Sequence, residues 1–382
     1  MTTELSNLAT GTDLDAKIFV SLELSKSRWG MVLHRPSRKK FSHQLFDGGD
    51  VAAVIEYLQA QRLSEEKRLG RPVRIVTCYE AGRDGFWLDR ALLAGGIDNR
   101  VFDAASLLVS RRAKKAKTDR LDGEGLLRTL MALERGDPGV VSLVRVPSVE
   151  DEDGRRLTRE RERMVREETQ HRNRITALLF TQGVRDVLLG RPCWTEKLSQ
   201  LRTGDGRPLP PRLVAELERE GARLALVREQ IAQVESEMRR AAAAQEQQAP
   251  VNQLHRLYAV GTVNSAILAG EVFSRKFVDR RHLASFVGLA PVPWASGGIS
   301  RDQGLAKTGN PRVRVAMIEL AWLWLRHQPD SDLSRWFRGR VGIQKGRVRR
   351  IAIVALARKL LVALWRFVTQ GVVPAGARLR AA

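Results

Sequence analysis

Four acidic residues have the types and positions that metal-assisted phosphate chemistry requires. Asp119 and Asp122 open a predicted helix and share one of its faces, because they lie three positions apart. Glu23 and Glu80 lie at or near the ends of predicted strands. Carboxylates that are brought together repel each other unless a cation neutralises them, so such a cluster in a basic chain suggests Mg²⁺ at a phosphodiester. Taken singly, each residue has a simpler role as a helix cap or a solvated strand residue.

A candidate nucleophile lies in the C-terminal third, where Ser296 precedes two glycines in a proline-containing segment. The prolines and glycines exclude a long regular element and leave the hydroxyl with little steric cover. Cations beside an exposed hydroxyl suit attack on a phosphate, since arginine neutralises the non-bridging oxygens. A plain Ser-Gly-Gly turn is the simpler alternative. The neighbouring cations are Arg301, Lys307, Arg312 and Arg314.

Composition favours a polyanionic partner. The 382-residue chain has a formal net charge of +22, which promotes binding to phosphates through release of counterions. A membrane surface is the weaker alternative, because the most apolar run, Ile351–Val368, contains three cations. Two cysteines and an N-terminus without signal-peptide features lead us to expect an intracellular protein.

The first third of the chain predicts an RNase H-like α/β fold. Three strands are followed by a helix, a strand, a helix, a strand and a helix, an order that fits a mixed sheet with the first strand central. In such a sheet, Glu23, Glu80 and the aspartate pair would meet at one edge. The predicted elements are strands Ile18–Leu24, Trp29–His34, Lys39–Phe46, Val73–Tyr79 and Asn99–Phe102, a helix Val51–Leu63, a loop and helix Gly82–Leu93, and the helix of Asp119.

Two long helices are predicted next, over residues 150–183 and 211–243. Apolar residues of the second helix alternate at spacings of three and four from Leu224 onward, as in a coiled coil, but Glu220 interrupts the seam. The helices would form either an antiparallel hairpin or a dimerisation element. Further on, residues 254–270 weakly resemble a helix-hairpin-helix, and the basic stretch Arg338–Arg350 suits contact with a nucleic-acid backbone.

These motifs resemble the DEDD transposases of insertion sequences, the bridge-RNA-guided serine recombinases, over most of the chain. Val20–Lys26 is similar to the first-strand motif V-G-I-D-V-S-K, with Glu23 where the family has Asp. Tyr79–Ala81 matches the second acidic position, and Lys117–Asp122 matches K-T-D-x-x-D, the most specific motif. The C-terminal match comprises Leu283–Pro291, Ser296–Gly298, Lys307–Asn310 and Arg314.

The resemblance implies a RuvC-like domain at residues 1–140, a helical coiled-coil linker at 141–250 and a mostly helical C-terminal transposase domain at 251–382. It makes Ser296 the catalytic nucleophile. It also assigns Mg²⁺ or Mn²⁺ to the carboxylates of Glu23, Glu80, Asp119 and Asp122. Together with the basic segments, it leads us to expect nucleic-acid contacts from Arg301, Lys307, Arg312, Arg314, Lys114, Lys115 and Lys117.

The implied activity is DNA strand cleavage and exchange through a phosphoserine intermediate. The implied partners are donor and target DNA, a structured non-coding guide RNA and further copies of the chain, in a dimer or tetramer in the bacterial cytoplasm near the nucleoid. Two alternatives remain open at this point. One is a metal-dependent RuvC-like nuclease or junction resolvase without a covalent intermediate, and the other is a non-catalytic nucleic-acid-binding protein.

Overall fold

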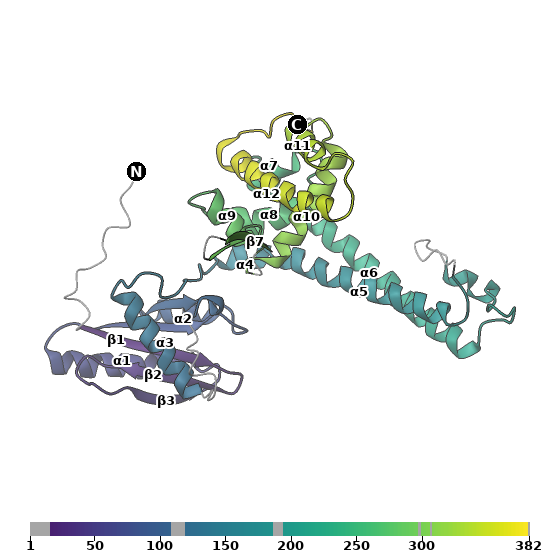
Figure 1. Ribbon diagram of the computed structural model, residues 1–382. Helices are drawn as coiled ribbons and strands as arrows, with labels where there is room; N and C mark the ends of the chain where they lie inside the picture. Colours follow the sequence, from purple (N-terminus) through teal and green to yellow (C-terminus); the bar gives the residue numbers. More distant parts are fainter. Residues whose placement is uncertain (1–15, 108–118, 186–193, 297–298, 306–307, 381–382) are drawn as a thin grey trace. The chain divides into compact units, whose positions relative to one another are not determined.

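The computed structural model describes residues 16–107, 119–185, 194–296, 299–305 and 308–380 (Figure 1). The chain forms two compact units, residues 1–148 and 149–382, which we call unit 1 and unit 2. In the described part of the chain, no helix is both long enough and apolar enough to cross a bilayer. The predicted division into three domains stays a prediction.

Unit 1 is built on a five-stranded mixed sheet of order β3-β2-β1-β4-β5. The central strand β1 pairs antiparallel with β2 and parallel with β4. This arrangement confirms the predicted mixed sheet with its first strand in the middle, while the RuvC-like assignment stays a prediction. The strands are β1 (Lys17–Leu24), β2 (Arg28–His34), β3 (Ser42–Asp47), β4 (Arg74–Glu80) and β5 (Asp98–Phe102).

Helices cover both faces of this sheet (Figure 1). Alternate residues of a strand point to opposite faces, so the apolar run of β1 feeds two cores. Ile18, Val20 and Leu22 pack with α1 (Val51–Leu69) and α2 (Trp87–Ala94). On the other face, Phe19 packs with the leucines of α3 (Asp119–Glu134). A short 3₁₀ turn, η2 (Ala104–Ser106), follows β5.

A long helical hairpin begins unit 2, after the short helix α4 (Val149–Gly154) (Figure 1). Its arms are α5 (Arg156–Phe180) and α6 (Pro211–Ala243). Ion pairs join Arg161 to Glu235 and Arg174 to Glu216, which shows that the two helices run antiparallel. The apolar stripe of α6 is thus buried within its own chain, and dimerisation through a coiled coil stays a prediction. The buried apolar side chains of the two arms are Met164, Ile175, Leu179, Leu217, Leu224, Val227, Val234 and Met238.

Glu220, which interrupts the apolar seam, has a polar partner across the hairpin. Its Oε2 lies 2.7 Å from Nδ1 of His171. This hydrogen bond, together with the charges of His171 and Arg223, lowers the pKa of Glu220 below its ordinary value. At this position of the hairpin, a hydrogen-bonded polar pair therefore takes the place of an apolar contact.

The rest of unit 2 is a helical bundle centred on α10 and α12, whose apolar faces share one core. The only strands described in this unit, β6 and β7, form an antiparallel hairpin that the sequence did not predict. Pro291 and Pro293 are tolerated in β6 because a two-stranded sheet consists of edges alone. The short helix η4 (Thr195–Gln200) packs with the hairpin arms. The elements of the bundle are α7 (Pro250–His255), α8 (Thr262–Leu268), the π-helix η5 (Ala269–Phe273), α9 (Arg280–Val287), β6 (Pro291–Ser296), β7 (Ile299–Leu305), α10 (Pro311–His327), α11 (Asp332–Val341) and α12 (Arg347–Gln370).

Candidate functional site

Glu23 and Glu80 occupy neighbouring positions at the carboxyl ends of β1 and β4. The parallel register pairs Leu22 with Tyr79, and the two glutamates follow one residue later on their strands. By the alternation of the strands, both share a face with Ser21 and Cys78. The side chains of Ser21 and Cys78 reach the backbone of α3, so Glu23 and Glu80 lie on the face that α3 covers.

The N-terminal part of α3 is fixed against β1 by a buried hydrogen bond. Ser21 Oγ donates to the carbonyl oxygen of Gly123 over 2.7 Å. A Cβ at position 123 would lie 2.8 Å from Cγ2 of Val32, so only glycine permits this approach. At the other end of α3, Glu134 pairs with Lys17 and with Arg100, each over 3.2 Å. The helix therefore runs antiparallel to β1, with its start toward Glu23.

The four predicted acidic positions consequently share one face at one end of the sheet. Glu80 is exposed, Asp122 is half-buried, and Oε2 of the half-buried Glu23 is shielded from solvent. For Asp119 only the backbone position is described. Among the side chains that the structure describes, no three of His, Cys, Asp or Glu form a group that could hold a metal ion. Metal binding by the four carboxylates therefore stays a prediction.

Ser21 and Gly123 position α3 against β1, a role that was not predicted from the sequence. A glycine within a helix costs about 0.5–1 kcal/mol relative to alanine, so it indicates a place where another element approaches closely. Gly123 directly follows Asp122, and Ser21 lies two residues before Glu23 on the same strand face. Those two spacings were the signals from which the contact could have been found.

In unit 2, Ser296 is the last residue of β6 and pairs with Ile299 of β7. Arg301 lies further along β7, opposite Trp294. Only the backbone positions of Ser296 and Arg301 are described. Gly297, Gly298 and the predicted phosphate-binding residues Lys307, Lys114, Lys115 and Lys117 lie outside the described residues.

Two glycines at positive φ are in main-chain contact at the base of this hairpin, and we call this contact the glycine clamp. Gly288 (φ 71°) ends α9 just before β6, and Gly309 (φ 91°) lies between β7 and α10. A Cβ on Gly309 would lie 2.5 Å from the backbone nitrogen of Gly288, so the two segments touch through their main chains. Asn310 N donates to Phe286 O over 2.8 Å, and Arg314 Nη2 donates to Thr308 O over 2.7 Å. Asn310 and Arg314, two residues of the C-terminal family match, thus make hydrogen bonds at the base of the hairpin.

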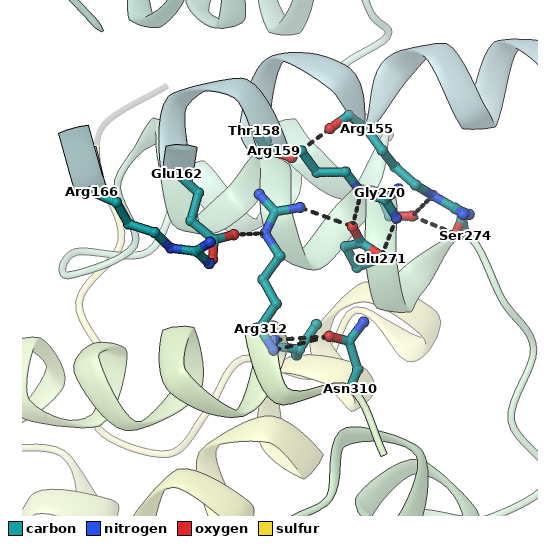
Figure 2. Close-up of polar contacts among 11 residues, drawn as sticks. Arg155, Thr158, Arg159, Glu162, Arg166, Gly270, Glu271, Ser274, Asn310 and Arg312 are labelled. Carbon is teal, nitrogen blue, oxygen red and sulfur yellow. Dashed lines mark hydrogen bonds and ion pairs between the residues drawn. The ribbon is translucent and has the colours of Figure 1, made fainter. Parts of the chain in front are cut away.

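Arg312 is engaged in an ion-pair network between α5, η5 and α10 (Figure 2). Its Nε lies 2.6 Å from Glu162 Oε2, and its Nη1 donates to Glu271 Oε1 over 2.9 Å. Glu271 also pairs with Arg159 over 3.1 Å. The side chain of Arg312 is 14% exposed and two carboxylates already neutralise its charge, so the structure gives it a scaffold role. Its predicted phosphate contact stays a prediction.

Glu271 is the buried centre of this network, with a side chain that is 7% exposed. Burial alone would raise the pKa of Glu271. The hydrogen bond from Arg159 and the nearby arginine charges outweigh burial and lower the pKa below its ordinary value. Glu271 lies in a π-helix, an element that often marks functional positions.

Comparison with known proteins places this chain among transposases. A model of the transposase IS116/IS110/IS902 family matches residues 251–334, which include Ser296 and Arg314. The chain is 45% identical over 383 residues to y4rJ of Sinorhizobium fredii, which is named as a transposase, and the match covers 96% of each chain. It is 26% identical over 300 residues to the transposase for insertion sequence element IS1111A of Coxiella burnetii, covering 78% of each chain.

Proposed function

The chain belongs to the IS116/IS110/IS902 family of transposases, and we propose that it exchanges DNA strands through a covalent bond between Ser296 and the scissile phosphate. A transposase acts on DNA, and the charge of +22 suits that polyanion. The finer proposal is that of a serine recombinase with an acidic metal site.

In the proposed reaction, Ser296 Oγ attacks the phosphorus of a phosphodiester. The Oγ–P bond forms, the bond from phosphorus to one deoxyribose oxygen breaks, and that oxygen takes up a proton while the serine hydroxyl loses one. The bond energy is retained in the phosphoserine, so a second deoxyribose hydroxyl can reverse the step and join a new strand. The glycine clamp at Gly288 and Gly309 supports this role because it fixes the strand that carries Ser296.

The observation that best supports the acidic half of the site is the Ser21–Gly123 hydrogen bond, which holds the start of α3 at the ends of β1 and β4. We propose that Glu23, Glu80, Asp119 and Asp122 bind Mg²⁺ or Mn²⁺. Their carboxylate oxygens are the donors that such hard cations prefer. When bound, the metal would supply positive charge at the scissile phosphate.

The predicted nucleophile and the predicted acidic residues belong to different units. We propose that a homo-oligomer, a dimer or a tetramer, combines them into one site and that a structured guide RNA selects the DNA. Mixing Ser296→Ala and Asp119→Asn proteins tests the oligomer, because a site shared between protomers regains strand exchange that each variant alone has lost. Failure of the mixture to regain activity rejects the shared site.

Trapping of a protein–DNA adduct tests the central step. Wild-type protein with labelled DNA, the guide RNA and Mg²⁺ is expected to give a labelled band that survives denaturation, and Ser296→Ala is expected to lose it. Ser300→Ala is the matched control, because Ser300 lies in β7 of the same hairpin. DNA cleavage by Ser296→Ala at the wild-type rate would instead identify a nuclease in which water attacks.

A further inference from the structure

The C-terminal end of the chain carries an unusually uniform charge. Residues 333–382 contain twelve lysines and arginines and no aspartate or glutamate, so no side-chain carboxylate of the segment itself can neutralise them. Six of these cations gather around the turn from α11 to α12. We call them the C-terminal basic surface: Arg338, Arg340, Lys345, Arg347, Arg349 and Arg350.

All six side chains are exposed. Among the residues that the structure describes, none of the six forms an ion pair. Arg335, one turn earlier in α11, differs in this respect because it pairs with Asp332. Exposed cations that lack carboxylate partners retain their full charge for an external anion.

The turn that carries these cations is anchored by buried residues of the two helices that flank it. Phe337 and Val341 of α11 and Ile353 of α12 are buried in the common core on either side of it. Gly342 (φ 53°) and Gly346 (φ 65°) provide the positive backbone angles that the connection needs. The cations therefore project from a supported turn between two packed helices.

The tryptophans near this surface either contact cations of the same chain or pack in the core. The guanidinium of Arg349 lies 4.9 Å from the ring centre of Trp322, and the ammonium of Lys359 lies 4.8 Å from that of Trp336. Trp324 is buried and donates to Ser331 Oγ over 2.9 Å. Proteins that bind unpaired bases offer open aromatic faces for stacking, whereas this surface offers mainly cations.

We propose that the C-terminal basic surface binds the phosphate backbone of duplex DNA, independently of its sequence, and holds the substrate of the transposition reaction. Its charge complements phosphodiesters, and a paired duplex requires no stacking platform. The inference rests on the proposed function only in taking DNA as the substrate. It does not depend on Ser296 or on a metal.

Salt-dependent binding tests this assignment. Fluorescence anisotropy would follow binding to a DNA duplex of about 20 base pairs, between about 0.05 and 0.2 M salt. For R347Q/R349Q/R350Q, the slope of log K against log salt concentration is expected to become shallower by about two to three, close to one per lost phosphate contact. R338Q/R340Q/K345Q should show a similar decrease in the salt slope, and this variant leaves the Arg349–Trp322 contact intact.

A matched control removes the same charge elsewhere. R74Q/R135Q/R207Q replaces three arginines that are about half exposed or more and are paired with Asp98, Asp137 and Asp205. It is expected to keep a slope close to that of the wild type, and circular dichroism verifies folding of every variant. Equal slopes for the basic-surface variants and the control, or a loss confined to a folded RNA hairpin, would overturn the assignment. The adduct formed by Ser296 is measured separately, so either proposal can fail alone.

Discussion

The acidic end of unit 1 and the serine hairpin of unit 2 are held in place by different means. In unit 1, a continuous sheet aligns Glu23 with Glu80, and one buried hydrogen bond brings α3 to them. In unit 2, main-chain contact at two glycines and an ion network around Glu271 hold the elements next to Ser296. Contacts between residues far apart in sequence act in both units, since Ser21 and Gly123 are separated by 102 residues and Glu271 and Arg312 by 41. The comparison teaches that a buried hydrogen bond does for the acidic end what close main-chain packing and ion pairs do for the hairpin.

Glu271→Ala is expected to give the largest effect, because it leaves Arg312 and Arg159 without their buried partner. Breaking such a pair costs about 3–5 kcal/mol, and we expect a loss of that size in the free energy of unfolding. Urea denaturation measures it. Asp332→Ala is the control, since its ion pair with Arg335 is exposed and should cost no more than about 1 kcal/mol. Equal losses in the two variants would remove Glu271 as the centre of the network.

The difference in stability between the wild type and Glu271→Ala is expected to depend on pH. Because the pKa of Glu271 is lowered in the folded state, its stabilisation is complete above the pKa of an unfolded glutamate, about 4.3. The stabilisation is lost as the pH falls through the lowered folded value. The stabilities of wild type and Glu271→Ala should therefore converge in acid, and a constant difference across that range would contradict the assigned ion pairs.

Gly309→Ala separates close packing from backbone strain. Gly304 has nearly the same backbone angle (φ 90°), but a Cβ there would meet no atom within 4 Å. Gly304→Ala should therefore cost only the left-handed conformation, about 1–2 kcal/mol. Gly309→Ala must also displace Gly288, so about 3 kcal/mol and a larger loss of adduct yield are expected. Equal melting temperatures and equal adduct yields for the two variants would argue against the clamp.

Ser21→Ala probes the corresponding link in unit 1. It removes the hydrogen bond to Gly123 and should destabilise unit 1 by about 1–2 kcal/mol. Hydrogen exchange at the first amides of α3 should accelerate, while the far end near Glu134 remains protected. Ser25→Ala, which removes only local bonds to the backbone oxygen and nitrogen of Arg28, serves as the control. Unchanged exchange at the start of α3 would show that this bond does not position the helix.

Glu220→Gln should give the smallest effect, below about 1 kcal/mol at neutral pH. The lowered pKa of Glu220 means that its contribution is present above the ordinary glutamate pKa and disappears as the pH falls through the lowered folded value. Glu218→Gln, an exposed position on the same helix, is the comparison in thermal unfolding. A difference between the variants that keeps growing as the pH falls below the ordinary glutamate pKa, about 4.3, would contradict the pairing with His171.

The sequence predicted unit 1 better than unit 2 for a physical reason. The apolar run Ile18–Leu24 and the alternation of strands and helices depend on neighbours in sequence, and the central strand followed from them. The β6–β7 hairpin was missed because prolines usually exclude strands. The ion pairs of Arg312 were not predicted, because its carboxylate partners, Glu162 and Glu271, lie far away in sequence, the nearer by 41 residues. Contacts of that kind become visible only in the folded chain.

The most direct test of the central claim is mass spectrometry of the trapped adduct after digestion of both protein and DNA. We expect a nucleotide remnant on the peptide that contains Ser296, attached through a phosphoserine bond. A remnant on any other residue, or efficient strand cleavage without an adduct, would contradict it.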